Sequence, residues 1–156
     1  MHIRLITVGR TDIPWVKQGL ETYASRLSHY VNFETEEIPE LKNVSALTRG
    51  QIKEKEGALI LKALHPRDCV VLLDEHGKEY RSVEFASELS SLMQSGKDLA
   101  FVIGGAYGFS PEVYARADRK LSLSKMTFSH QMVRTIFAEQ LYRAFTILRG
   151  EPYHHE

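Results

Sequence analysis

The stretch LAFVIGGAYGFSP, residues 99–111, carries the clearest signal of fold class in the sequence. Its first five residues are continuously apolar and few, which is typical of a strand buried on both faces of a parallel sheet. Three glycines between positions 104 and 108 then end the strand. Ser110 favours a helix N-cap, and Pro111 suits the first position of a helix. The stretch therefore predicts a buried strand, a glycine-rich turn and a helix in direct succession.

Strand and helix signals alternate in the same way along the whole chain. Apolar runs and alternating patterns predict strands at 3–8, 31–38, 69–73, 99–103 and 121–123. Spacings of three and four, with caps and stops, predict helices at 15–27, 45–64, 82–96, from 111, and at 133–148. A turn is predicted at 74–78. The fold class is therefore α/β, with a mainly parallel sheet and helices on both faces, in a single domain over 1–156.

The charge of the chain argues mildly against a strongly basic nucleic-acid binder. The chain has 20 basic and 20 acidic residues and a formal net charge of zero. Positive charge is concentrated locally at Arg116, Arg119, Lys120 and Lys125, opposed only by Asp118. This stretch is a candidate RNA contact, although a solvated surface fits the same pattern.

Cysteine usage and the termini indicate where the protein works. The single cysteine, Cys69, lies in an apolar run and is interpreted as a buried hydrophobic residue, which fits a reducing cytoplasm. The N-terminus lacks a secretory pattern, and no apolar run approaches the ~18 residues of a membrane span. His154 and His155 are adjacent and lack zinc-ligand spacing. We expect a cytoplasmic protein that binds neither membrane nor metal.

Three strand ends have the composition of a ligand site. They are Leu73-Asp74 with Gly77, the glycine turn at 104–108, and the segment 123–128. Ligands in parallel sheets bind beyond the carboxyl ends of the strands, and glycine lets the backbone approach a ligand closely. Glycines needed only for tight loop geometry would give the same pattern. A dinucleotide fingerprint fails because Ile103 stands at its first glycine, and a P-loop fails because Glu79 follows Gly77-Lys78.

Several strings resemble one family. They are FVIGGAYGF at 101–109, LSLSKMTFSHQMVR at 121–134, EQLYRA at 139–144 and PYH at 152–154. They resemble the ribosomal RNA large subunit methyltransferase H family of the SPOUT superfamily, and the likeness covers nearly the whole chain. The resemblance implies methyl transfer from S-adenosylmethionine to N3 of a pseudouridine in 23S ribosomal RNA. It also implies a C-terminal trefoil knot, which pattern reasoning would not propose because threaded chains are rare.

The resemblance also implies a cofactor site and two departures from the family pattern. The residues expected to hold the cofactor, including both glycines of the turn, are Leu73, Gly104, Gly105, Leu123, Ser124, Lys125, Met126, Thr127 and Phe128. Ser129 stands where the family has proline, so we expect a less rigid loop entry. His155 stands where the family has lysine or arginine, which leaves a phosphate-binding cation there in doubt.

Four residues beside these motifs are candidates for the chemistry. A sulfonium methyl donor is already a strong electrophile, so alignment is the main task, and help with the N3 proton is a smaller one. His130 and Arg134 lie one helical turn apart and can face one site. A local hydrogen bond for His130 and a surface salt bridge for Arg134 are the structural alternatives. Tyr153 and His154 are the candidates in the tail, where disorder is the alternative.

Assembly and function keep open alternatives. Apolar residues on more than one side of the last helix, including Met132, Phe137, Tyr142 and Phe145, predict a homodimer interface, unless the helix is simply buried. A dimer would pair two copies of the basic stretch on large-subunit ribosomal RNA within the ribosome. A non-catalytic ribosome-binding or assembly module is the alternative function.

Overall fold

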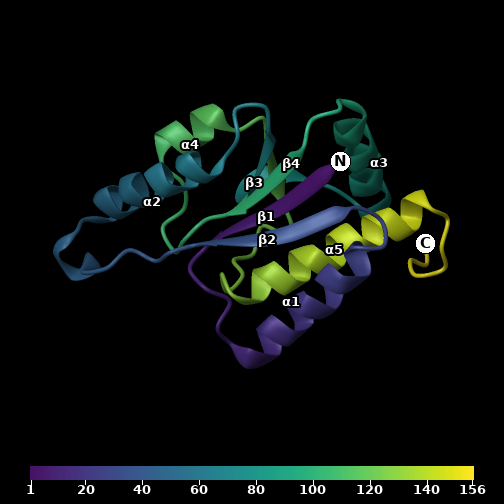
Figure 1. The fold of residues 1–156 in the computed structure, drawn as a ribbon, viewed down its shortest axis with the longest axis horizontal. Coiled ribbons are helices and arrows are strands. Elements are labelled where there is room, and N and C mark those ends of the chain that lie inside the picture. The colour runs from purple at the N-terminus through teal and green to yellow at the C-terminus, as the bar shows by residue number, and fades with distance from the viewer.

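A five-stranded parallel sheet forms the centre of the computed structural model, which describes residues 1–156 (Figure 1). Its order is β2-β1-β4-β3-β5, and all four neighbouring pairs are parallel. The strands are β1 (His2–Val8), β2 (Asn32–Ile38), β3 (Cys69–Glu79), β4 (Leu99–Ile103) and β5 (Arg119–Ser122).

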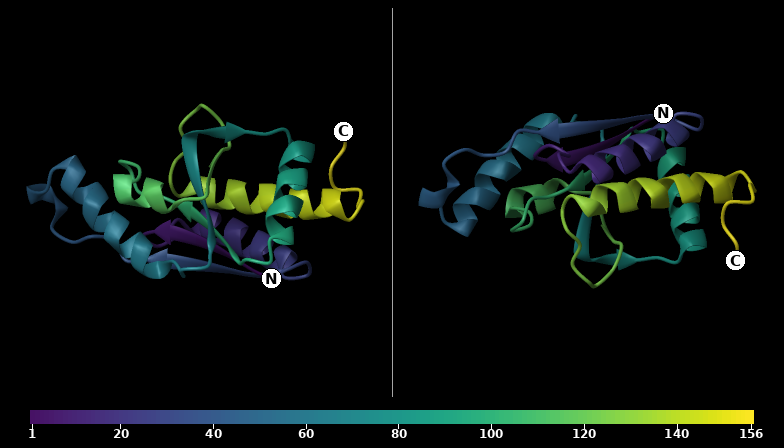
Figure 2. Two further views of the ribbon diagram at one scale, coloured as in Figure 1. Left: turned by 90° about the horizontal axis from the view of Figure 1, so that it is seen from above. Right: turned by 90° about the horizontal axis from the view of Figure 1, so that it is seen from below.

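Helices cover both faces of the sheet, as the sequence predicts. They are α1 (Pro14–Leu27), α2 (Arg49–Ala63), α3 (Ser82–Gln94), α4 (Pro111–Arg116) and α5 (Met132–Leu148), with a short 3₁₀ helix η1 (Val44–Ala46). In Figures 1 and 2, α1, α3 and α5 pack on one face, and α2 and α4 on the other. The predicted α/β class is confirmed. No helix is both long enough and apolar enough to cross a membrane.

Strand β4 lies between two hydrophobic cores, which explains its continuous apolar sequence. Leu99, Phe101 and Ile103 belong to the core beneath α1, α3 and α5, whereas Ala100 and Val102 belong to the core beneath α2 and α4. All five residues are buried, so neither face of the strand can carry a polar side chain without a partner.

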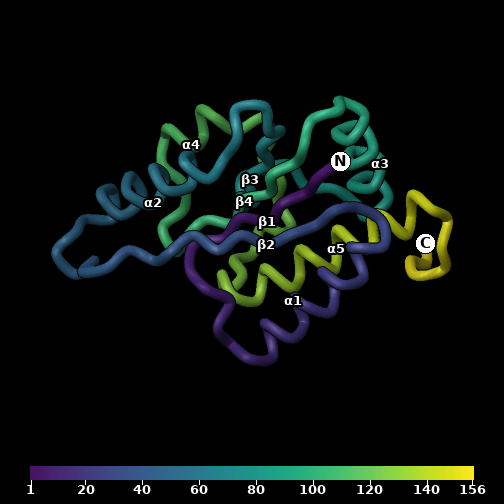
Figure 3. Tube along the Cα trace, viewed as in Figure 1, coloured from purple at the N-terminus to yellow at the C-terminus, as the bar shows by residue number.

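Helix α5 is the main element of the larger core. It packs against α1 and α3, and Figure 3 traces it from the 123–131 loop along the length of α1. Phe137 and Phe145 are buried, and the rings of Phe137 and Phe101 lie 4.8 Å apart. Their prediction as interface residues is wrong, because they fill the core of their own chain. Met132 is 42% exposed and stays available for an interface, while the trefoil knot stays a prediction.

The predicted turn at 74–78 is instead part of β3. Leu73 and Lys78 both pair with Leu121, so the residues between them form a bulge in this long strand, which lies between β4 and β5. A Cβ atom at Gly77 would lie 2.7 Å from the carbonyl carbon of Lys120, so glycine is required where the two backbones meet. Nothing in the local pattern of residues 74–78 predicts this pairing, because β5 lies far away in the sequence.

Helix starts are set by caps, and two of them differ from prediction. Helix α2 begins at Arg49 rather than at 45, because Thr48 and Gln51 form a capping box. Helix α3 is capped one residue earlier than expected, and the Glu84 carboxylate accepts from the Arg81 N–H at 2.8 Å. The Ser110 cap is confirmed by its hydroxyl, which accepts from the Val113 N–H at 3.3 Å.

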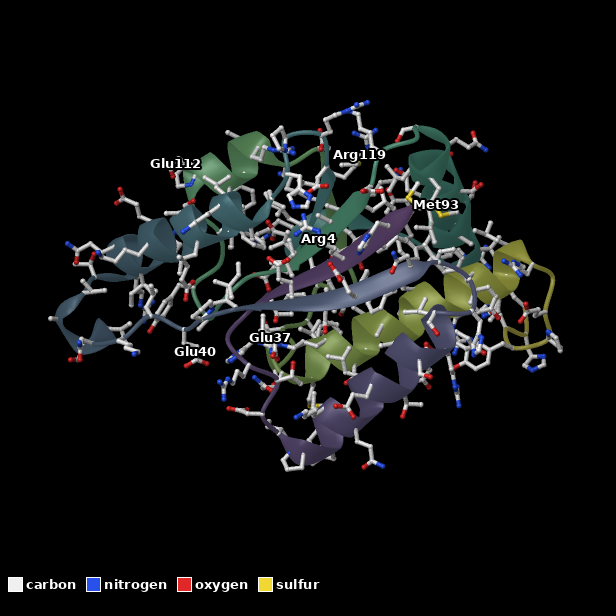
Figure 4. The ribbon with its side chains drawn as sticks, viewed as in Figure 1. Arg4, Glu37, Glu40, Met93, Glu112 and Arg119 are labelled. Atoms are coloured by element: carbon white, nitrogen blue, oxygen red, sulfur yellow. The ribbon has the colours of Figure 1, made fainter.

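A buried ion pair joins the start of the sheet to the chain after α2. The Arg4 guanidinium donates to Asp68 at 2.5 Å and to the Ala63 carbonyl at 2.9 Å, and Figure 4 labels Arg4 within the sheet region. Removing one partner would leave the other charge buried and unpaired, so the pair fixes the approach of α2 to the sheet.

Gly77→Ala should lower the free energy of unfolding by about 1 to 3 kcal/mol, because the added methyl group collides with the β5 backbone. Gly50→Ala is the matched control. It lies in the first turn of α2 with open space around it and should raise stability by at most about 1 kcal/mol. Urea denaturation of both variants measures the difference, and equal stabilities would contradict the close β3–β5 contact.

Candidate functional site

A pocket of about 780 Å³ opens where the carboxyl ends of β3, β4 and β5 meet. Its walls come from residues 73–76, the glycine turn and Phe109 at 103–109, and the loop between β5 and α5. This volume lies in the range of small-molecule sites, and strand ends are where parallel sheets bind ligands. The three segments singled out in the sequence therefore converge on one cavity.

The residues predicted to hold the cofactor line this pocket, with one exception. Those in the wall are Leu73, Gly104, Gly105, Leu123, Ser124, Met126, Thr127 and Phe128. Lys125 is not part of the wall. Its side chain is 86% exposed, and its ammonium lies 4.0 Å from the Glu79 carboxylate.

The glycine turn is pressed between two side chains on its outer side. A Cβ atom at Gly104 would lie 2.9 Å from the Phe109 ring, and one at Gly105 would lie 2.6 Å from Glu56 Oε1. At Gly104 a side chain would collide with the buried Phe109 ring, whereas at Gly105 it would have to displace the Glu56 carboxylate. Glycine avoids both collisions, and its backbone forms part of the pocket wall.

The Glu56 carboxylate lies behind this turn in an environment that disfavours its charge. Its Oε1 atom is buried and has no hydrogen-bond partner. Burial, and then the nearby Glu40 carboxylate, raise the pKa of Glu56 above its ordinary value. The acidic side chain of Glu56 thus lies against the wall of the pocket and not inside it.

The loop after β5 is braced from within and from β3. The Ser122 hydroxyl donates to the Ser124 carbonyl at 2.9 Å, and the Met126 N–H donates to the Ser124 hydroxyl at 3.0 Å. The Thr127 hydroxyl donates to Glu75 at 3.3 Å. Met126 is 78% exposed although it lies in the pocket wall. The loop therefore holds a defined shape while its apolar tip stays accessible.

Several wall residues were missed by sequence reasoning. Arg49 and Lys53 reach the pocket from α2, and the Arg49 guanidinium lies 5.1 Å from the centre of the Tyr107 ring. The Tyr114 hydroxyl donates to Asp74 at 2.5 Å, and burial followed by this bond raises the pKa of Tyr114 to about 12. Arg49 and Lys53 lie four residues apart on α2, but no spacing signal links this pair to Tyr114, because α2 and α4 are separate elements that only the fold brings together.

His130 and Arg134 point to different places, although they are one helical turn apart. His130 lines the pocket. The Arg134 side chain is 1% exposed and donates to four oxygens: the carbonyls of Val8 (2.8 Å), Gly9 (3.0 Å) and His130 (3.0 Å), and the Thr11 hydroxyl (2.8 Å). Burial lowers the pKa of Arg134. The structure thus places Arg134 in a buried clamp outside the pocket wall.

Ser129 takes over a structural role in the place of the family's proline. Its hydroxyl accepts from the N–H groups of Gln131 at 3.2 Å and Met132 at 3.4 Å. Met132 is the first residue of α5 and Gln131 precedes it, so neither N–H has an intrahelical acceptor. The Ser129 hydroxyl therefore restrains the loop entry and offsets the loss of the stiffness that proline would supply.

The tail is folded back on α5 and lies far from the pocket of its own chain. The Tyr153 ring packs on Tyr142 at 4.8 Å, and His154 contacts Arg143. Figure 2 shows the tail beyond the far end of α5. Because His154 contacts Arg143, which lies 13 residues after His130, the two histidines are separated by about 20 Å along the axis of α5. One chain alone does not bring its four candidate residues together.

The basic stretch is largely engaged by local partners. Arg116 donates to the carbonyls of His65 at 3.1 Å and Asp68 at 3.0 Å and so ties the end of α4 to the chain before β3. Arg119 lies 3.7 Å from Glu88, and Figure 4 places it at the edge of the sheet near α3. Lys120 lies over the Tyr114 ring at 5.6 Å. Arg116 and Arg119 thus lie against oxygen atoms and Lys120 lies over an aromatic ring, so these side chains form less free basic surface than the sequence predicts.

Comparison with known proteins places the chain in a family. The sequence model described as "Predicted SPOUT methyltransferase" matches residues 1–154. Proteins named ribosomal RNA large subunit methyltransferase H are similar over the full length of both chains: that of Parabacteroides distasonis at 57% identity and that of Bacteroides fragilis at 58%.

Among solved structures, a probable methylase family protein from Haemophilus influenzae Rd KW20 resembles the fold. Its TM-score is 0.51 at 15% identity, over 99% of this chain and 70% of that one, which supports the fold alone. The sequence matches carry the assignment further. The chain therefore belongs to the SPOUT methyltransferase family, in its ribosomal RNA large subunit methyltransferase H group, and its cofactor is S-adenosylmethionine.

Proposed function

We propose that this protein methylates N3 of a pseudouridine in 23S ribosomal RNA on the assembled ribosome, in the cytoplasm, with S-adenosylmethionine as methyl donor. The observation that carries the proposal is the convergence of Leu73, the glycine turn and the 123–128 segment on one pocket. The names of the relatives at 57% and 58% identity point to the same class of RNA.

The pocket fits the cofactor in size and in chemistry. Leu73, Leu123 and Phe128 offer apolar surface, and the turn at Gly104 and Gly105 offers backbone that approaches a ligand without intervening side chains. S-Adenosylmethionine supplies an electrophilic methyl group, so the task of these residues is to hold the reacting groups in line. Lys125, outside the wall, is proposed to act only through its backbone.

A second copy of the chain would complete the site. The tail contacts α5 at Arg143, about 20 Å along the helix from the His130 end of its own pocket. An apolar hollow of about 230 Å³ lies beside the pocket, between α3, β5 and α5, and shares Leu121, Leu123 and Phe128 with it. A homodimer covering this hollow would bury exposed apolar surface and could carry the partner's tail to the pocket. In this arrangement His130, Tyr153 and His154 would meet at the target base, while Arg134 would hold the loop beneath them.

Methylation of ribosomes tests the function directly. Purified protein, labelled S-adenosylmethionine and ribosomes lacking the modification should yield one methyl group, placed on N3 of a pseudouridine by mass spectrometry of digested RNA. Free 23S RNA should react far more slowly, because a chain of zero net charge is a weak electrostatic trap for RNA alone. Ribosome binding without methyl transfer would favour the non-catalytic assembly module instead.

The glycine turn at 104–108, which packs against Phe109 and Glu56, provides a test of the pocket. Gly105→Ala should weaken S-adenosylmethionine binding by at least ~10-fold, because the methyl group meets Glu56 and displaces the turn. Adding Glu56→Ala removes the collision and should restore most of the affinity, which titration calorimetry measures. Equal affinities in the single and double variants would show that this turn does not bear on the cofactor.

Removing Tyr153 to Glu156 should leave cofactor affinity unchanged and lower ribosome methylation by at least ~100-fold, the scale of lost positioning. Mixed dimers locate the effect. A tailless subunit paired with a Gly105→Val subunit keeps one intact pocket that only the partner's tail can serve, and should be active.

The matched control puts both changes in one subunit and leaves the other unaltered. Its intact pocket then faces a tailless partner, so a tail acting across the dimer predicts little activity. The reverse pattern, with only the control active, would assign the tail to the pocket of its own chain.

A further inference from the structure

The contact between Arg143 and His154 specifies the state of the histidine ring. Arg143 Nη1 lies 3.0 Å from His154 Nδ1. Guanidinium is a donor with no acceptor atom, so Nδ1 must supply a lone pair to this bond. A neutral imidazole with an unprotonated Nδ1 carries its proton on Nε2. The geometry therefore makes His154 a hydrogen-bond donor at Nε2.

Arg143 is itself held so that this contact is not an accident of a mobile side chain. Its Nε and Nη2 atoms donate to Glu139 Oε1 at 3.1 Å and 2.7 Å, one helical turn away. Its guanidinium lies 4.8 Å from the centre of the Tyr153 ring. Glu139, Arg143 and both tail residues thus form one ordered unit, here called the tail clamp.

The Nε2–H group of His154 makes no hydrogen bond within the chain. Nε2 is buried and has no hydrogen-bond partner. Glu156 Oε1 lies 3.8 Å away, beyond hydrogen-bond distance, and is held at 3.0 Å by Arg81. A buried donor without an acceptor is unfavourable, so this N–H is a candidate to meet an acceptor that arrives with substrate.

We infer that Arg143 is a positioning residue that fixes His154 as an Nε2–H donor, and that His154 binds a carbonyl oxygen of the target base instead of accepting its proton. The inference rests on the proposed function for the identity of the base. A uracil-type ring that loses its N3 proton spreads negative charge onto the two flanking carbonyl oxygens. A fixed donor at one of them stabilises this anion without itself changing protonation.

Tyr153, the other tail residue, likewise does not act as a base at neutral pH. Burial, and then a hydrogen bond with Tyr23, raise the pKa of Tyr153 to about 12, so its phenol stays protonated at neutral pH. The N3 proton then passes to water. The N3–carbon bond forms as the sulfur–carbon bond breaks, and the electron pair of the broken bond stays on sulfur as a neutral thioether.

Nitrogen NMR of the full-length protein labelled at histidine tests the ring state without any substrate. We expect His154 to have an unprotonated Nδ1 and a protonated Nε2 in the wild type and in Arg143→Lys, which keeps a donor. Arg143→Met should shift His154 towards a mixture of tautomers. Arg26→Met is the control, because Arg26 lies over Tyr23 and Tyr142 without contacting His154. A proton on Nδ1 in the wild type would overturn the inference, as would an unchanged ring in Arg143→Met.

Single-turnover methylation of ribosomes separates a donor from a base. His154→Gln keeps an N–H donor at a similar reach and should stay within about 10-fold of the wild-type rate, whereas His154→Ala should lose at least ~100-fold. Equal losses in the two variants would identify His154 as a base and refute the donor role. If the wild type methylates no RNA, the proposed function fails, while the NMR result still decides the ring state.

Discussion

The buried guanidinium of Arg134 connects the two ends of the chain and thereby shapes the site. It donates to the carbonyls of Val8 and Gly9 at the end of β1, to the Thr11 hydroxyl, and to the His130 carbonyl at the pocket rim. Burying a guanidinium is unfavourable unless its donors are satisfied, and four hydrogen bonds satisfy four of its five N–H groups. The Gln131 side-chain amide makes two more hydrogen bonds to the chain after β1: it donates to the Arg10 carbonyl and accepts from the Asp12 N–H. The entry to α5 is therefore fixed relative to the sheet.

The chain of 156 residues holds both a pocket and an ordered tail, at different places along α5. At one end of α5, Arg134 fixes the loop that closes the pocket. At the other end, Glu139 and Arg143 order the tail. The rigid helix sets the separation between them. Under the proposed function, a second copy of the chain resolves this separation, and the site becomes a property of the dimer.

The sequence could predict the parts of the structure that depend on local pattern. The apolar run at β4 is buried on both faces, and the glycine turn stands at the end of a strand, as expected. What failed depends on contacts far apart in sequence. The polar residues 74–78 continue β3 only because β5 pairs with them, and Phe137 is a core residue only because the sheet lies against α5.

The candidate site divides in the same way. The segment 123–128 was singled out as the loop after a predicted strand and also through its likeness to a family, whereas Arg49 and Lys53, on the helix predicted at 45–64, were not named as site residues. Helical spacing predicted that His130 and Arg134 lie one turn apart on a helix, but α5 begins at Met132 and His130 lies in the turn before it. Spacing could not tell that Arg134 points back to β1, because that direction depends on where the loop before α5 lies.

Hydrogen–deuterium exchange of Arg134→Met tests the role of the clamp most directly. Local opening raises exchange only in segments that lose their restraints. If the hydrogen bonds of Arg134 hold the pocket loop, exchange becomes faster in residues 9–11 and 124–131 together, while α2 and α4 on the opposite face are unchanged. Faster exchange in 9–11 alone, with the pocket loop as protected as in the wild type, would contradict the claim that Arg134 holds the pocket in shape.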